Sequence, residues 1–460
     1  MDVRVVDEAL VSALLGGCQR LRSEAAGTSK ENDRGLGAAD PSMNDFTHVI
    51  SSPEEIIAAA ERLRKAAMTT EIAPDTILDV FETWASALGA PDTSNIPGVA
   101  FLRLWLRRGT LEPIIHRELG PGALHGDWTE DGRARLKAYP IGVVGHWPAG
   151  NVEIQPILSA ICALLGGNAS LVRIPTDLVD VTRVLMQKLD QSDASHILTG
   201  RVFMGAFDHA CQDLQVAMAR AVDGAMIWGG EEAVLKVRAL PFPHWARLAV
   251  FGPRISLAAM DADTWCDKQE RASWCRRIAR DVWQFDQQAC SSPQVLFLEK
   301  KAGDSPEGFL QDLGNAFEAE NRLHPRQTIQ AALTSAICQV RASWLLDHAA
   351  NKALFSLSPD WTLLLGAGSE APKPTQGRTL TVLEVDDLFD PISKLDANVQ
   401  TLGLGVKSTE KEERLASAAA RRGVNRIVKI GRMHVFTSPW DGLDLVRPMV
   451  RIIRHVPSTE

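Results

Sequence analysis

Short apolar runs alternate with helical stretches from residue 139 onward, and this alternation is the clearest pattern in the chain. The first block has apolar runs at residues 141–144, 170–174, 201–204, 225–228 and 247–250. Helical patterns separate these runs at residues 153–165, 177–189, 209–222 and 231–240. A strand, a helix and a strand at this spacing predict βαβ units, whose parallel sheet is covered by helices on both faces.

A second alternating block begins near Ile255. Its expected strands lie at residues 295–298, 361–365, 379–385, 401–406 and 425–429. The chain therefore predicts an α/β protein with two α/β domains. A helical region and a parallel-sheet domain are expected over 47–250, a second α/β domain over 251–432, and a C-terminal segment that packs back on the body over 433–460.

The N-terminal part has a different character. Residues 20–46 are polar, small and aperiodic, so residues 1–46 are expected to form a flexible or weakly ordered arm. Order is expected to begin at Ser52, an N-cap residue followed by Pro53 at the first helical position and by Glu55, which completes a capping box. The apolar face of this helix is expected at Ile56, Ile57, Ala60 and Leu63.

Composition and charge exclude several classes of protein. A chain of 460 residues with 45% hydrophobic residues is long enough to bury a large core. The net charge is −8 and no dense basic tract is present, which argues against a dedicated nucleic-acid binder. There is no run of 18 apolar residues and no signal-like N-terminus, so neither a membrane span nor export is expected.

The seven cysteines are scattered and form no C-x-x-C pair, which favours a reduced cytoplasmic protein without a structural metal. One of them, Cys290, stands in the segment Asp-Gln-Gln-Ala-Cys-Ser-Ser-Pro-Gln at 286–294, directly before an expected strand. A thiol among small and amide residues in such a loop is a candidate nucleophile. Taken alone, however, the pattern favours the interpretation given to the other cysteines, that of a small buried apolar residue. Those others are Cys18, Cys162, Cys211, Cys266, Cys275 and Cys338.

A second segment, Gly-Val-Val-Gly-His-Trp-Pro-Ala-Gly-Asn at 142–151, links an expected strand to an expected helix. Its glycines and proline suit a sharp turn that brings backbone close to a ligand. It lacks both the G-x-G-x-x-G spacing and the G-K-[ST] of a phosphate loop, so an ordinary βα connection remains open. Asn151 can be a turn or helix N-cap residue, and His146 a proton carrier or a loop histidine.

Taken together and in order, these segments resemble the aldehyde dehydrogenase superfamily over residues 139–430. Within it they are most similar to the long-chain acyl-CoA reductase family of bacterial bioluminescence, the LuxC-like family. The resemblance also includes Leu-Leu-Gly-Gly-Asn-Ala-Ser-Leu-Val-Arg at 164–173, Met-Ile-Trp-Gly-Gly at 226–230 and Asp-Leu-Phe-Asp-Pro at 387–391. The closing segments over 400–430 follow the same order.

The resemblance implies roles for particular residues. Cys290 would be the nucleophile, and Asn151 would hold the oxyanion together with the Cys290 backbone N–H. Arg173 would contact the adenosine ribose, where the alternative is a solvated strand end, and Trp228 would only pack beside the cofactor. The implied cofactor-binding residues are Trp147, Pro148 and Ala149 in the turn, Arg173, Gly229 and Gly230 under the pyrophosphate, and Asp387 and Phe389 at the nicotinamide ribose.

The departures from the superfamily pattern matter as well. Its dehydrogenases carry a water-activating glutamate near the position of Ala249, and no acidic residue lies within 246–260 here. Deacylation by water needs a positioned general base, whereas departure of a thiol does not. The absence therefore favours thioester chemistry. Asp387 stands where the dehydrogenases usually have the longer glutamate.

The expected function is NADPH-dependent reduction of an acyl thioester to an aldehyde through a Cys290 acyl-enzyme. NADPH is expected because Arg173 can pair with a 2′-phosphate. The acyl donor would be a CoA or carrier-protein thioester, with an acyl-transferring partner protein possible and a homo-oligomer expected. Three alternatives remain open: a hydrolytic aldehyde dehydrogenase, an acyl-phosphate reductase, and a non-catalytic nucleotide-binding protein.

Overall fold

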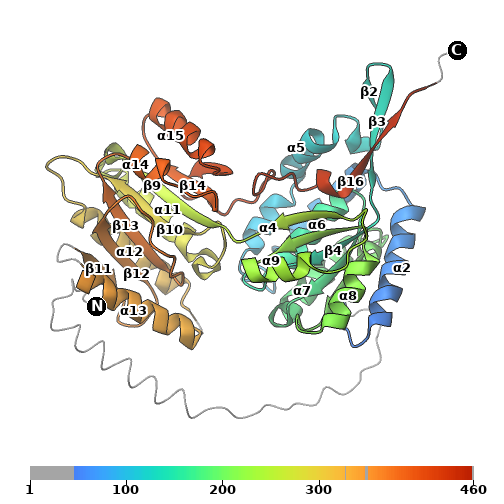
Figure 1. Cartoon of the computed structure of the whole chain (residues 1–460), viewed down its shortest axis with the longest axis horizontal. Coiled ribbons are helices and arrows are strands. Elements are labelled where there is room, and N and C mark those ends of the chain that lie inside the picture. Colours follow the sequence, from blue (N-terminus) through green and yellow to red (C-terminus); the bar gives the residue numbers. More distant parts are fainter. Residues whose placement is uncertain (1–45, 327, 348–350, 458–460) are drawn as a thin grey trace, which may run out of the picture. The chain divides into compact units, whose positions relative to one another are not determined.

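The computed structural model describes residues 46–326, 328–347 and 351–457. The expected N-terminal arm, with Cys18, falls outside them apart from Phe46. The described residues form two compact units (Figure 1). One, the N-terminal unit, contains residues up to 253 and from 436 onward; the other, the C-terminal unit, contains 254–435.

The N-terminal unit is built on a six-stranded parallel sheet in the order β1-β6-β5-β4-β7-β8. The strands are β1 Thr47–Val49, β4 Val143–Trp147, β5 Ala169–Ile174, β6 Val202–Ala206, β7 Gly224–Trp228 and β8 Arg247–Phe251. All five expected strands are present, while β1 was not expected. The strand expected from residue 141 begins at Val143, because the N–H groups of Ile141 and Gly142 donate to the Asn168 side chain at 2.8 and 3.2 Å.

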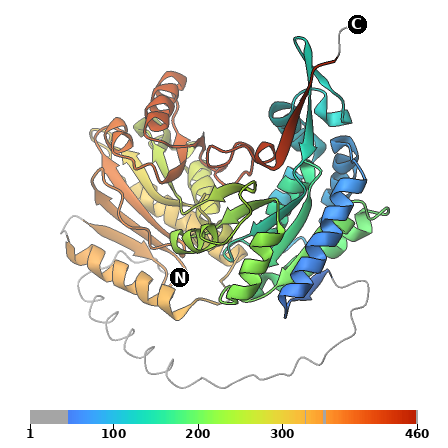
Figure 2. The ribbon, with the colours of Figure 1, turned by 45° about the vertical axis from the view of Figure 1, so that its right-hand side comes forward.

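Helices cover both faces of this sheet. They are α2 Pro53–Thr69, α3 Pro74–Ala87, α4 Val99–Trp105, α5 Arg108–Leu119, α6 Gln155–Leu165, α7 Val179–Ser192, α8 Gln212–Ala221 and α9 Glu231–Arg238. Figure 2 shows α2 running beside α8 on one face. Apolar side chains of α2 and α8 pack there with those of the strands and form a buried core on that face of the sheet.

The start of α2 follows the expectation with two differences. Ser52 accepts the Glu55 N–H at 3.5 Å, and Pro53 is the first helical residue. The Glu55 carboxylate, however, accepts from the Ser51 hydroxyl at 2.6 Å, so the return half of the capping box is displaced by one residue. Ile57 is 45% exposed, so its expected place on the buried face is wrong, whereas Ile56 and the other two apolar residues of that face are buried.

A small antiparallel sheet in the order β16-β3-β2 also belongs to the N-terminal unit. Its strands are β2 Thr129–Asp131, β3 Ala134–Pro140 and β16 Val450–His455. The approach to β16 is held by Glu118 of α5, whose buried carboxylate accepts the N–H groups of Val446 and Arg447 at 2.7 and 2.9 Å. The sequence pattern predicted none of these three strands, because each is short or half exposed.

The C-terminal unit contains a seven-stranded sheet in the order β11-β12-β13-β10-β9-β14-β15. Its strands are β9 Ile255–Met260, β10 Pro293–Glu299, β11 Lys352–Phe355, β12 Thr362–Ala367, β13 Thr379–Val385, β14 Val399–Gly405 and β15 Arg426–Lys429. All pairs are parallel except β11 with β12, an antiparallel edge that was not expected. The α/β class predicted from the sequence is confirmed.

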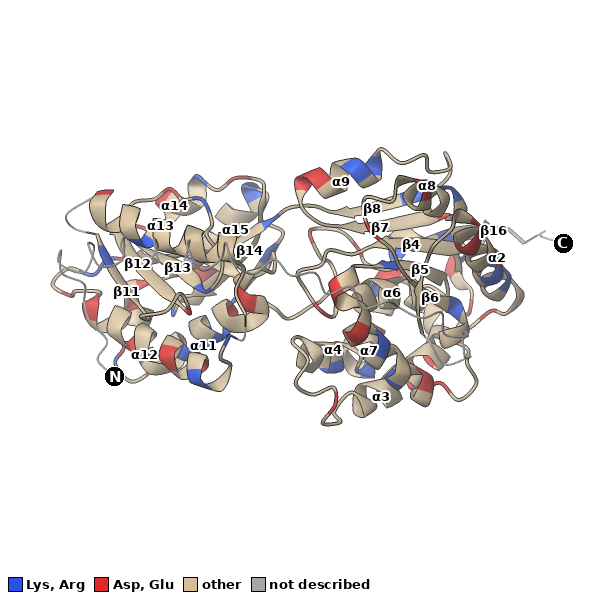
Figure 3. Ribbon diagram, turned by 90° about the horizontal axis from the view of Figure 1, so that it is seen from below, with Lys and Arg blue, Asp and Glu red and all other residues tan. Residues whose placement is uncertain are grey.

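The helices of this unit are α10 Ala262–Trp265, α11 Arg271–Trp283, α12 Glu307–Leu323, α13 Ala331–Asp347, α14 Phe389–Ser393 and α15 Thr409–Arg421. Figure 3 shows α11 and α12 side by side on one face, where Trp283 and Phe317 meet edge to face at 5.4 Å between ring centroids. Charged residues of both signs are spread over the helices (Figure 3). None of the helices in the described part of the chain combines the length and apolar composition of a membrane span.

Candidate active site

Cys290 lies in the C-terminal unit, on the nucleophile loop, which we define as residues 285–294, from the turn after α11 to the first two residues of β10. The loop opens with a 3₁₀ turn in which Phe285, Asp286 and Gln287 have φ values of 54°, 54° and 62°. Non-glycine residues rarely adopt this left-handed conformation, which costs about 1–2 kcal/mol per residue. Three in succession persist only when surrounding contacts hold them in place.

The loop is fastened to β9 at Cys290 itself. The thiol-bearing residue is partly exposed, and its backbone carbonyl accepts a hydrogen bond from Ser256 of β9 at 2.7 Å. Ser256 is fully buried. The side chain of Cys290 therefore extends from a backbone position that is fixed to the sheet.

A buried histidine holds the next residue. His434 Nε2 lies 2.7 Å from the Asp281 carbonyl oxygen, and its Nδ1 lies 2.9 Å from Ser291 Oγ. Because a carbonyl oxygen only accepts, Nε2 carries the proton and Nδ1 accepts from the Ser291 hydroxyl. Burial lowers the pKa of His434 to about 4, so this histidine is neutral near pH 7 and orients Ser291.

Asp281 lies near the end of α11, and its carboxyl group connects this helix to the loop after β15. It accepts the N–H groups of Gly431 and Met433. Burial raises the pKa of Asp281 to about 7, although these two N–H groups act in the opposite direction. Sequence reasoning missed both Asp281 and His434, since nothing in the local pattern connects them to Cys290.

The other cysteines differ from Cys290 in their surroundings. Cys162 and Cys275 are buried as expected, and burial raises the pKa of Cys162 well above its usual range and that of Cys275 to about 12. Cys211 is exposed, which contradicts the expectation of a buried residue, and Cys266 and Cys338 are partly exposed. The thiols of Cys162 and Cys275 stay protonated and inaccessible.

The turn that carries Asn151 lies in the N-terminal unit, between the end of β4 at Trp147 and the start of α6. Trp147 donates its indole N–H to Gln215 at 2.7 Å, and the Ala149 N–H donates to the Gln155 side chain at 2.8 Å. Asn151 is exposed. The interpretation of Asn151 as a helix N-cap is wrong, because α6 begins at Gln155 and Ile154 holds the cap position.

His146 is a core residue of β4, so its interpretation as a loop histidine is wrong. Its side chain is fully buried, and Nδ1 lies 2.7 Å from Ser159 Oγ, which also accepts the Trp228 indole N–H at 2.9 Å. Burial lowers the pKa of His146 to about 3, which argues against a proton carrier. Trp228 stacks on Phe251 with ring centroids 3.8 Å apart, in keeping with a packing role for this side chain.

Arg173 stands near the end of β5, partly buried, with its guanidinium 6.0 Å from the Phe207 ring. Its Nε is buried and has no hydrogen-bond partner among the described residues. Burial lowers the pKa of Arg173, while the nearby Asp208 carboxylate acts in the opposite direction. A solvated strand end does not fit these surroundings, and the orphaned N–H suits an anionic ligand.

Gly229 and Gly230 form the connection from β7 to α9. Gly229 has φ +153°, a conformation that residues with a side chain rarely adopt. Gly230 occupies the N-cap position of α9 without a side-chain cap, and a Cβ placed on it would meet nothing within 4 Å. The backbone is thus open to a ligand, although Glu231 and Glu232 put negative charge in the first turn, the acidic start of α9 in Figure 3.

The predicted site residues of the N-terminal unit all lie at one edge of its parallel sheet. Asn151 and the turn follow β4, Arg173 is the penultimate residue of β5, and the two glycines follow β7. These are neighbouring parallel strands, in the order β5-β4-β7. The carboxyl edge of an open parallel sheet is where such folds bind ligands. Ala249, within the adjacent β8, is buried.

Asp387 and Phe389 are not brought to Cys290. Cys290 precedes β10 whereas Asp387 follows β13, and these strands are parallel neighbours with Val295 opposite Thr381. At about 3.3 Å per residue, the length of β13 separates the two ends by about 20 Å. Asp387 instead accepts the Phe389 N–H at 3.0 Å at the start of α14. This geometry does not support their predicted contact with a nicotinamide ribose beside Cys290.

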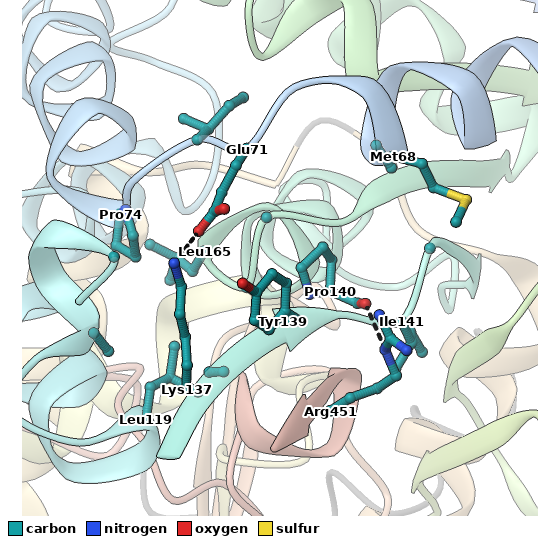
Figure 4. Close-up of a pocket in the computed structure, with 18 of the residues that line it drawn as sticks. Met68, Glu71, Pro74, Leu119, Lys137, Tyr139, Pro140, Ile141, Leu165 and Arg451 are labelled. Atoms are coloured by element: carbon teal, nitrogen blue, oxygen red, sulfur yellow. Dashed lines mark hydrogen bonds and ion pairs between the residues drawn. The ribbon is translucent and has the colours of Figure 1, made fainter. Parts of the chain in front are cut away.

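A cavity of about 450 Å³ lies elsewhere in the N-terminal unit (Figure 4). It is lined by Gly142, Arg201 and Asp223, which precede β4, β6 and β7 and therefore mark the amino edge of the sheet. Lys137 pairs with Glu71 at 2.6 Å within it. None of the predicted site residues lines this cavity, which is at the opposite edge of the sheet from the predicted cofactor residues of the N-terminal unit.

Comparison with known proteins identifies the family. The model of the family described as Acyl-CoA reductase (LuxC) matches residues 54–452. The chain belongs to this family. The resemblance stated from the sequence is thereby confirmed.

Two relatives of the LuxC family protein illustrate the similarity. The long-chain acyl-protein thioester reductase of Vibrio harveyi is 23% identical over 356 residues, covering 76% of this chain and 71% of the relative. The long-chain acyl-protein thioester reductase 2 of Photobacterium leiognathi is 25% identical over 366 residues, covering 76% and 72%.

Solved structures share the fold. An Escherichia coli NADP dependent enzyme has a TM-score of 0.65 at 12% identity, covering 87% of this chain and 90% of that chain. An aldehyde dehydrogenase from Brucella melitensis has a TM-score of 0.63 at 13% identity, covering 93% and 97%. The fold is therefore that of the aldehyde dehydrogenases, as the sequence predicted.

Proposed function

We propose that this LuxC family protein reduces an acyl thioester to an aldehyde with NADPH, through an acyl-enzyme on Cys290. The observation that carries the proposal is the partly exposed Cys290 on a loop held in a strained conformation by buried partners. Such loops persist where a reactive group must be kept in one geometry. Family membership supplies the reaction class.

In the first half of the reaction, the Cys290 thiolate attacks the thioester carbonyl carbon. The Cys290 backbone N–H and the Asn151 side chain are proposed to hold the oxyanion. The carrier thiol then departs and leaves the acyl group on Cys290. Bound NADPH would supply the hydride that reduces this acyl-enzyme, and collapse of the resulting hemithioacetal would return the Cys290 thiol and release the aldehyde.

The residues around the proposed cofactor site fit a nicotinamide dinucleotide phosphate. The orphaned Nε of Arg173 supports pairing with a 2′-phosphate. The open, uncapped backbone at Gly230 supports close approach of a pyrophosphate, and Trp147, Pro148 and Ala149 lie at the same strand edge. The negative charges of Glu231 and Glu232 act against phosphate binding at this helix start. We therefore assign the pyrophosphate contact to backbone N–H groups and the 2′-phosphate contact to Arg173.

The surroundings of Ala249 support transfer to a thiol rather than hydrolysis. The residue is 4% exposed in β8, and the stretch 246–260 supplies no carboxylate. Without a positioned base, water attacks an acyl-enzyme slowly. Given aldehyde and NADP⁺, the protein is expected to form a thioester when a carrier thiol is added and little free acid without one.

The names of the relatives refer to acyl groups carried on proteins, so we propose a carrier-protein or enzyme-bound acyl donor in preference to free CoA. An acyl-transferring partner, homo-oligomerisation and a cytoplasmic location remain predictions.

The largest expected effect is loss of the nucleophile. Intact-mass spectrometry after incubation with acyl-CoA or acyl carrier protein, without cofactor, should show one acyl adduct on the wild type and none on Cys290→Ala. NADPH should then release the acyl group as aldehyde. Cys211→Ala is the matched control, because Cys211 is an exposed cysteine outside the site, and it should acylate normally. An adduct on Cys290→Ala, or rapid acid formation from aldehyde without a thiol, would overturn the proposal.

A further inference from the structure

Two runs of left-handed backbone meet at the base of the nucleophile loop. Phe285, Asp286 and Gln287 form the first, and Gln376, Gly377 and Arg378 form the second, with φ values of 65°, 62° and 61°. The second run leads directly into β13 at Thr379. Because five of these six residues are not glycine, the junction needs side-chain contacts to offset its backbone strain.

The Gln287 carboxamide connects the two runs. Its Nε2 donates to the carbonyl oxygens of Pro293 and Thr379, both at 2.8 Å, and its Oε1 accepts the Thr379 N–H at 2.7 Å. The side chain is fully buried. Both amide hydrogens and the oxygen are therefore engaged in water-excluded hydrogen bonds.

These bonds replace a missing step of the β-ladder. Strands β10 and β13 pair in register from Val295 opposite Thr381. Two residues earlier no such pair forms, and the register of β10 is irregular between Pro293 and Val295. The Gln287 carboxamide occupies this place and pairs with the backbone of both strand starts. A side chain from the nucleophile loop is thus built into the sheet.

Two ion pairs of Asp286 reinforce the same junction. Asp286 Oδ1 lies 2.7 Å from Arg378 Nε and 2.8 Å from Arg326 Nη2. The arginine side chains are only 8% and 5% exposed. Arg378 also stacks over Trp283 at 4.4 Å. Asp286 and Gln287 thus connect the nucleophile loop to β13 and to the residue before it. They precede Cys290 by four and three residues.

We propose that Gln287 is a positioning residue for the thioester chemistry of Cys290: its carboxamide pins the nucleophile loop to β13 and thereby sets where the thiol and the Cys290 backbone N–H stand. The inference rests on the proposed function of Cys290. Gln287 touches no substrate in this role. Its removal should slow acylation while the apparent affinity for the thioester stays unchanged.

Gln287→Gly separates this role from backbone strain. Glycine suits a φ of 62° better than glutamine does, so the variant relieves strain while it removes all three hydrogen bonds. Gln376→Gly is the matched control. Gln376 is also a left-handed glutamine at this junction, but its side chain is exposed and makes no hydrogen bond with the residues that the structure describes.

The measurements are the single-turnover rate of acyl-adduct formation by mass spectrometry and amide hydrogen exchange over residues 285–294. In Gln287→Gly, acylation should slow by roughly tenfold or more and exchange should accelerate. Gln376→Gly should match the wild type in both. Unchanged acylation in Gln287→Gly overturns the inference, whether or not exchange accelerates. A wild type that forms no adduct overturns the proposed function instead, and this result is distinct because the adduct is then absent before any substitution at Gln287.

Gln287→Glu gives an independent pH readout. A protonated carboxyl can accept from the Thr379 N–H and donate to one carbonyl, whereas a carboxylate donates to none and faces both carbonyl oxygens. Burial holds carboxyl groups in the protonated form to higher pH. The acylation rate of this variant relative to the wild type should therefore fall as the pH rises from about 6 to about 8. A constant ratio across that range would contradict a hydrogen-bonding role for the side chain.

Discussion

The two sets of predicted site residues are built in contrasting ways. In the N-terminal unit, Asn151, Arg173 and Gly230 stand at the carboxyl ends of neighbouring strands. Asn151 is exposed, the buried Arg173 Nε has no hydrogen-bond partner among the described residues, and a Cβ on Gly230 would meet nothing within 4 Å. In the C-terminal unit, Cys290 stands on a loop before β10 whose neighbours are buried and hydrogen-bonded. An edge of the first kind is suited to recognising a ligand, while the second kind fixes one reacting atom.

This contrast predicts different responses to substitution. Substituting residues that recognise a ligand should weaken separate interactions, so each variant should lose a different binding or rate property. Residues that hold the nucleophile loop should affect one quantity together, the rate of acylation. After loss of Cys290 itself, four tests follow in order of expected effect.

Asn151→Ala tests whether the N-terminal unit also serves the chemical step. Loss of one oxyanion donor typically lowers the rate 10²–10³-fold, or about 2.7–4 kcal/mol of transition-state stabilisation. Single-turnover acylation should show this loss while the Kd for NADPH stays constant. Normal acylation with weakened NADPH binding would make Asn151 part of the ligand-binding edge alone.

Ser291→Ala tests whether the hydrogen bond between Ser291 and His434 positions the nucleophile loop. The substitution leaves the buried His434 Nδ1 without the Ser291 hydroxyl, at a cost of about 1–3 kcal/mol, and acylation should slow by up to about tenfold. Ser292→Ala is the matched control, since the buried Ser292 Oγ has no hydrogen-bond partner among the described residues. Equal rates in both variants would show that His434 does not position the loop.

Arg173→Ala should raise the KM for NADPH and leave the KM for NADH and the kcat nearly unchanged, because a 2′-phosphate gains most from the guanidinium. Arg173→Lys keeps the positive charge but lacks the two-pronged guanidinium, so its KM for NADPH should lie between those of the wild type and Arg173→Ala. Steady-state kinetics with both cofactors check this. A wild type that uses both equally would remove the basis for the assignment.

The smallest effect concerns acid stability, for which the described residues include one buried histidine in each unit. Burial lowers the pKa of His146 to about 3 and that of His434 to about 4, from 6.5. The unfolded chain therefore binds more protons, so each unit loses stability as the pH falls below about 6.5. The raised pKa of Asp281, about 7, acts in the opposite direction, because its contribution is lost as the pH rises through that value.

His146→Gln should flatten the acid dependence in the N-terminal unit alone. Hydrogen exchange in urea at about pH 5 and about pH 7.5 assigns the loss of protection to peptides of either unit. The C-terminal unit should keep its acid sensitivity in this variant. An unchanged loss in the N-terminal unit would mean that another group governs its acid unfolding.

Several features of the site were predictable because they are local. The turn after β4 is marked by glycine and proline, and the loop before β10 by small and amide residues, each beside an apolar run. The short strands β1 and β16 and the antiparallel edge β11 were not predicted, since a three- to six-residue strand carries little periodic signal. The failed N-cap interpretation of Asn151 shows the same limit at a helix boundary.

By itself, the sequence determined the alternation of strands and helices, the α/β class, the family and the candidate nucleophile, because apolar periodicity and short motifs are local properties of the chain. Only the tertiary structure decided which strand ends share an edge. It separated Asp387 from Cys290, joined Gln287 to Thr379, and brought His434 to Ser291. The physical reason is that sheet order and burial set these contacts, and neither is encoded in the residues adjacent to the site.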